Sequence, residues 1–132
     1  MTERWKQYVP LLLRIALGAI FIVHGWDKLS GDMSQTAAFF GKIGIPVPGF
    51  SAWLVAFVEF FGGIAVLTGL FTRIAAALIA IVMVVAMISV KFSQGFLGGW
   101  EFDFALFMIA VSLVISGDGE VALGQLFGKK AE

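Results

Sequence analysis

The segment YVPLLLRIALGAIFIVHGW, residues 8–26, decides the fold of this chain, because large apolar side chains fill almost all of it. An α-helix rises about 1.5 Å per residue, so a segment of this length crosses the ~30 Å hydrocarbon core of a bilayer. No small-residue cleavage site of the A-x-A kind follows it, and we therefore expect it to remain in the membrane as a helix.

Three further apolar segments follow the first, at residues 52–70, 74–90 and 100–116. The chain of 132 residues is 60% hydrophobic and has a mean hydropathy of +0.98, which is far more apolar than a soluble domain. The sequence thus predicts an all-α integral membrane protein, a four-helix bundle that forms one domain over residues 1–132. The uninterrupted apolar part of the last segment covers only residues 104–115, a length that is also typical of a re-entrant or interfacial segment. It spans the membrane if Glu101 and Asp103 lie at the level of the lipid headgroups, where carboxylates reach water.

The connections between these segments constrain their arrangement. The link TGLFTR, residues 68–73, is so short that the second and third spans must be antiparallel neighbours. The first loop, DMSQTAAFFGKIGIPVPGF at residues 32–50, gathers apolar side chains before a glycine and a proline. It predicts a short amphipathic helix at the membrane interface, followed by an extended Pro-Val-Pro turn.

The basic residues set the predicted orientation. With four spans, one side of the membrane carries Arg4, Lys6, Arg73, Lys129 and Lys130, and the other carries Lys28, Lys42 and Lys91. The side richer in lysine and arginine faces the cytoplasm. We therefore expect a multi-pass protein with its N- and C-termini cytoplasmic.

Composition also excludes several classes of function. Nine basic and nine acidic residues cancel, and no long basic run is present, so binding to nucleic acid has no electrostatic basis. The chain has no cysteine and one histidine, and its carboxylates are scattered, so no metal site is expected. Electron chemistry would therefore belong to a partner or to a bound cofactor.

Ionisable residues inside the apolar segments are the candidate functional residues, since each costs about 2.5 to 3.5 kcal/mol to insert unless it has a partner or a wet cavity. Helical spacing places Arg14, His24 and Lys28 on one face of the first span. Glu59 shares a face of the second span with small residues that allow a close helix approach. At helical rise, Glu59 lies at a depth that His24 and Lys28 can reach.

We therefore predict a buried polar cluster near the outer leaflet, formed by His24, Lys28, Glu59 and Glu101, with Asp103 as a further member. Arg14 is a candidate partner of Glu59 or of inner-leaflet phosphates. A structural role is an equal alternative, because a satisfied ionic cluster can fix helix register without any further function.

Five motifs resemble those of the DoxX family of small bacterial membrane proteins, of the DoxX-like YqjF and YphA type. They are LLLRIALGAIFIVHGWDKL (11–29), GIPVP (44–48), VEFFGGIAVLTGLFTRIAA (58–76), GGWEF (98–102) and GDGEVAL (117–123). The resemblance implies a four-helix protein of the bacterial inner membrane. It also implies an association with quinone-linked oxidoreductases or with oxidative-stress complexes, and hence with redox-enzyme partner proteins.

Three functions follow as hypotheses. In the first, the chain is at most a subunit of a quinone-linked oxidoreductase, and the cluster hydrogen-bonds a quinone or relays its protons, for which histidine is suited by its pKa near 6.5. In the second, a homo-oligomer transports a small solute. In the third, the protein is a non-catalytic scaffold or assembly factor. A cavity lined by aromatic residues would favour quinone binding, and a path open to both aqueous faces would favour transport. A tightly packed cluster with all its hydrogen bonds formed would favour the scaffold.

Overall fold

The computed structural model describes residues 2–128, and Lys129 and Lys130, which entered the charge comparison, lie outside the described residues. Over this range the chain is helical and contains no strand, so the predicted all-α fold is confirmed. The elements are α1 (Thr2–Lys6), α2 (Val9–Ser30), α3 (Met33–Lys42), α4 (Pro48–Thr68), α5 (Thr72–Ser89), the short turns η1 (Lys91–Gln94) and η2 (Phe96–Trp100), α6 (Glu101–Ser116) and α7 (Gln125–Gly128).

Four helical stretches are long and apolar enough to cross a membrane: Glu3–Ser30, Pro48–Thr68, Thr72–Ser89 and Phe96–Ser116. Each overlaps one segment expected from hydropathy, although most bounds differ by a few residues, and two of these differences concern the site. Helix α2 continues past Trp26 to Ser30, because Lys28 stays helical to reach a partner on α4. Helix α4 begins at Pro48 rather than at residue 52, since proline suits the first helical position.

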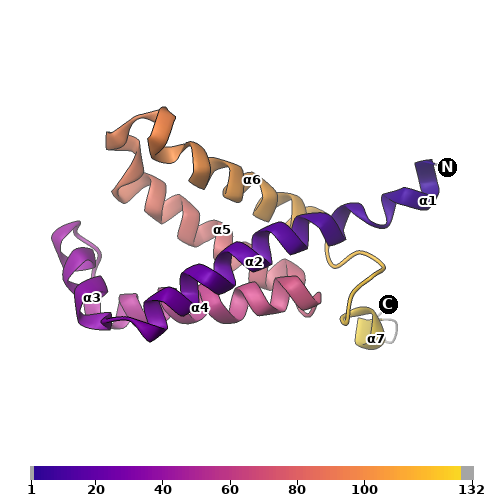
Figure 1. Cartoon of the computed structure of the whole chain (residues 1–132), viewed down its shortest axis with the longest axis horizontal. Helices are drawn as coiled ribbons and strands as arrows, with labels where there is room; N and C mark the ends of the chain where they lie inside the picture. The colour runs from indigo at the N-terminus through magenta and orange to yellow at the C-terminus, as the bar shows by residue number, and fades with distance from the viewer. Residues whose placement is uncertain (1, 129–132) are drawn as a thin grey trace.

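The helices form two pairs (Figure 1). Helix α2 packs along α4, and α5 packs along α6. The pairs converge at the end that carries both described chain ends, which we call the terminal end. They diverge toward the end that carries α3, which we call the α3 end.

Glycines allow the close approach of α2 and α4. A Cβ added to Gly18 would lie 2.8 Å from the Gly63 carbonyl oxygen, and one added to Gly63 would lie 2.7 Å from the Ile22 nitrogen. A Cβ on Gly25 would collide with the backbone of Phe60. The small residues on the Glu59 face of α4 thus serve the helix packing expected from the sequence.

The apolar core lies where the two pairs meet. Leu17 of α2, Val66 of α4 and Ile79 of α5 are fully buried, as is Leu113 of α6. This core holds the pairs together and closes the bundle toward the terminal end.

The predicted loop helix is present as α3 and packs against α4 at the α3 end. Asp32 caps it, because its carboxylate accepts hydrogen bonds from the Ser34 hydroxyl and from the Ser34 backbone N–H, the latter at 3.0 Å. These bonds, that of the hydroxyl first, lower the pKa of Asp32 below its ordinary value. None of the α3 side chains is buried, as suits a helix on an interface.

Candidate functional site

A cavity of about 780 Å³ lies between the two helix pairs toward the α3 end. Phe21, Met83 and Leu106 line it and also belong to the apolar core, so they form its floor. Aromatic side chains of α3, Phe39 and Phe40, line it at the α3 end. None of the deeper core residues takes part in the lining. The cavity is therefore a pocket that ends at the core and does not continue to the terminal end.

An ion pair stands on the wall formed by α2 and α4. The Lys28 Nζ donates to the Glu59 Oε2 at 3.0 Å, with 24% of the lysine side chain and 5% of the glutamate side chain exposed. Glu59 is held deep because α4 presents its buried face there, and Lys28 reaches it from the last turn of α2. Both residues line the cavity, so the pair places two opposite charges on this wall, whose other polar side chains are His24 and Ser51.

His24 lies one turn before Lys28 and also lines the cavity. Its ring is tilted against that of Phe21, with the centroids 6.2 Å apart. It makes no hydrogen bond with any residue of the described range. The structure therefore brings His24, Lys28 and Glu59 to one cavity, but it joins only the latter two directly.

Of the two acidic residues at the start of α6, it is Asp103 that lines the cavity, and Glu101 does not. Asp103 is 7% exposed, and Lys91 and His24 attract its carboxylate electrostatically. Two residues along a helix are about 200° apart, so the two carboxylates cannot share a face. Including Glu101 in the cluster was therefore wrong. The spacing of Asp103 with Leu106, Ala110 and Leu113 was the sequence signal that identifies the buried face.

Arg14 has partners other than Glu59, so that pairing was also wrong. Its guanidinium is 2% exposed and donates to backbone carbonyls from Nε, Nη1 and Nη2 at 2.6 to 3.1 Å. The acceptors belong to Val66, Leu67, Asp118 and Val121. The last carbonyls of a helix lack intrahelical partners and carry the negative end of its dipole, so the end of α4 attracts this cation.

The segment after α6, residues 117–124, folds back over the terminal end and was not recognised as a structural element from the sequence. The Asp118 carboxylate accepts from the Thr72 backbone N–H at 3.2 Å, at the start of α5. The backbone N–H groups of Leu123 and Gly124 donate to the carbonyls of Thr68 and Gly69. Together with Arg14, these bonds close the terminal end of the bundle.

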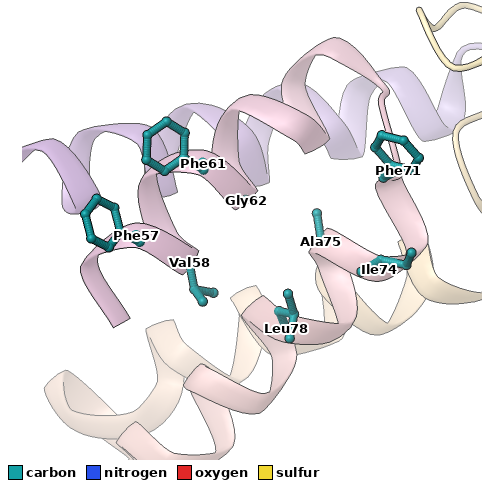
Figure 2. Close-up of a pocket in the computed structure, with 8 residues that line it drawn as sticks. All are labelled: Phe57, Val58, Phe61, Gly62, Phe71, Ile74, Ala75 and Leu78. Atoms are coloured by element: carbon teal, nitrogen blue, oxygen red, sulfur yellow. The ribbon is translucent and has the colours of Figure 1, made fainter. Parts of the chain in front are cut away.

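A second, shallower hollow of about 340 Å³ lies on the surface between α4 and α5 (Figure 2). Its lining carries no polar side chain: Phe57, Val58, Phe61, Gly62, Phe71, Ile74, Ala75 and Leu78. Val58 and Leu78 also line the large cavity, so these two side chains stand between the hollow and the cavity. The hollow is a lipid-facing groove, and the wall behind it is thin.

A family model described as DoxX matches residues 9–92. The chain is 42% identical over 113 residues to the Bacillus subtilis protein named "Putative oxidoreductase CatD", covering 86% of this chain and 82% of that protein. It is 32% identical over 126 residues to the Escherichia coli inner membrane protein YqjF, covering 91% and 92%. A membrane protein of Mycobacterium tuberculosis, Rv3486, is 31% identical over 134 residues, covering 92% and 82%. No solved structure matches the chain.

Proposed function

The chain belongs to the DoxX family of membrane proteins, and we propose that it is a quinone-binding subunit of a membrane oxidoreductase system. One observation carries the proposal: the helix pairs flank a cavity of about 780 Å³ whose mostly apolar lining includes the Lys28–Glu59 pair. This volume lies within the range of about 300 to 1,000 Å³ that is common for small-molecule sites.

The chemistry of the lining suits a quinone head group. Four phenylalanines line the cavity and offer flat apolar surfaces to a ring: Phe21, Phe39, Phe40 and Phe102. The Lys28 ammonium has three N–H donors and uses one on Glu59, so the others are free to donate to a quinone carbonyl. The thin wall at Val58 and Leu78 adjoins the lipid-facing groove. The apolar tail of a quinone can lie in that groove without an energetic cost.

Relatives support the redox context. CatD bears the name "Putative oxidoreductase", and YqjF is named an inner membrane protein. This chain has no cysteine, and no three metal-ligating side chains come together within residues 2–128. Electron transfer would thus rest on the bound quinone and on a redox-enzyme partner, for which the protein supplies binding and orientation. We place the termini in the cytoplasm and the α3 end, with the cavity, in the outer leaflet.

The two alternative functions have less support. A transport path must reach both aqueous faces. The residues that line this cavity lie toward the α3 end, and residues 117–124 cover the other end of the bundle. A purely structural clasp calls for polar side chains packed against one another. Here His24 and Asp103 face a cavity and have no hydrogen-bond partner among the described residues.

The test is purification in mild detergent, followed by solvent extraction and identification of bound quinone. We expect quinone to be retained by the wild type and lost from Lys28→Met, which keeps the length of the side chain and removes its donors. Asp27→Asn is the matched control, because Asp27 is exposed on the same turn of α2. A wild type that carries no quinone and takes up none of the added ubiquinone or menaquinone analogues would refute the proposal.

A further inference from the structure

A buried carboxylate without a partner marks a second polar point in the cavity. Asp103 is 7% exposed and faces the cavity from α6. It forms no hydrogen bond and no ion pair with any residue between 2 and 128. The carboxylate oxygens are not fully buried, so they are open to the cavity and can accept a hydrogen bond from a molecule bound there.

We propose that Asp103 accepts a hydrogen bond from the ligand in this cavity and thereby makes the site favour a quinol over the corresponding quinone. This inference rests on the proposed function, because it concerns the same site and the same class of ligand. A quinol hydroxyl donates a hydrogen bond, and a bond to a carboxylate is roughly twice as strong as one between neutral groups. A quinone carbonyl only accepts, so it has no bond to offer Asp103.

The opposite wall can bind either form. Lys28 and Glu59 stand there as a pair, and together they offer both N–H donors and a carboxylate acceptor. A carbonyl oxygen can accept from Lys28, and a hydroxyl can do so as well while donating to Glu59. This wall therefore accommodates both redox forms, and the Asp103 carboxylate adds a further acceptor that only a hydroxyl can use, which increases the difference in affinity in favour of the quinol.

The charges of the lining fit a neutral ligand. Lys28 and Lys91 are cationic, whereas Glu59 and Asp103 are anionic, so the formal charges cancel with His24 neutral. A cavity without net charge has no field that concentrates ions of one sign. A quinol is uncharged and carries two hydroxyl groups on opposite sides of its ring, which matches a site with polar groups on opposite walls.

The test compares the two redox forms directly. Purified protein in detergent is titrated with decyl-benzoquinone and, under argon with a reductant present, with its hydroquinone, and the heat of binding is measured. We expect the wild type to bind the hydroquinone more tightly. Asp103→Asn should weaken hydroquinone binding about tenfold or more, as expected for loss of a charge-assisted bond. It should leave quinone binding unchanged or tighter, because the new amide can donate.

Controls make each outcome decisive. Glu101→Gln lies two residues away on the same helix but outside the lining, so both affinities should stay at the wild-type value. An Asp103→Asn protein that binds both forms like the wild type, or loses both equally, overturns the inference and leaves the proposed function standing. If that variant does not fold, equal affinities of the wild type for the two forms contradict the inference. A wild type that binds neither form overturns both.

Discussion

Breaking the Lys28–Glu59 pair from either side should have unequal effects on stability. The Glu59 side chain is 5% exposed and that of Lys28 is 24% exposed. Lys28→Met leaves a carboxylate buried and unpaired, which costs about 3 to 5 kcal/mol when one partner of a buried pair is removed. Glu59→Leu leaves an ammonium on a flexible stem that can turn toward the α3 end, so we expect a cost of about 1 to 2 kcal/mol.

The double variant Lys28→Met/Glu59→Leu separates the pair from its surroundings. Replacing both charges by apolar groups of similar size is often neutral for stability, so we expect it to lie within about 1 kcal/mol of the wild type. Unfolding in mixed micelles of increasing SDS content, followed by tryptophan fluorescence, measures all three variants. Lys42→Met on α3, whose side chain is exposed, is the control. A larger loss of unfolding free energy in Glu59→Leu than in Lys28→Met would contradict this prediction. So would a double variant that loses the sum of the two single losses.

Three further predictions concern other parts of the bundle. Arg14→Met should lower the free energy of unfolding by about 3 to 5 kcal/mol, because buried carbonyls lose a charged donor, and limited proteolysis should then cut within residues 117–124. Gly25→Ala should cost about 1 to 3 kcal/mol in the same SDS titration, since its Cβ would force α2 away from Phe60. The cap of α3 should weaken in acid. The pKa of Asp32 is lowered in the folded state, so its contribution is present above its ordinary pKa of about 3.9 and is lost as the pH falls through the lower folded value. Far-UV circular dichroism between pH 6 and pH 2 follows the loss of helix.

A matched control variant accompanies each of these predictions. Arg73 makes one bond of 3.4 Å to the Ile115 carbonyl, so Arg73→Met should cost much less than Arg14→Met. A Cβ at Gly49 meets nothing within 4 Å, so Gly49→Ala should leave stability unchanged. Asp32→Ala should remove the acid-dependent part of the helix loss. Equal effects within the Arg14 and Arg73 pair or within the Gly25 and Gly49 pair, or an unchanged acid response in Asp32→Ala, would contradict the corresponding prediction.

Helix content and the inward faces were predictable because both depend on local spacing. A long apolar segment forms an α-helix in a bilayer, because each backbone polar group must be hydrogen-bonded within its own helix. The same periodicity placed Lys28 and Glu59 on facing surfaces, and the structure joins them at 3.0 Å. Their use as a ligand site remains a prediction.

Two features depended on contacts that no local pattern encodes. The bonds of Arg14 to Asp118 and Val121 join residues more than 100 positions apart, and their acceptors are backbone carbonyls, which every residue possesses. The cavity arises because the helix pairs diverge toward the α3 end, and this depends on how whole helices pack rather than on any motif (Figure 1). Only the choice between Glu101 and Asp103 had a signal in the sequence, the spacing of Asp103 with Leu106 and Ala110.

The most direct test of the account is to locate a bound quinone chemically. An azido-benzoquinone is photolysed with the purified protein, and the labelled peptides are identified by mass spectrometry. The account predicts saturable labelling of cavity segments, within residues 21–28, 39–46, 51–59 and 78–106, that is displaced by excess decyl-benzoquinone. Labelling confined to lipid-facing residues such as Leu12 or Ile115, or labelling that no competitor reduces, would contradict it.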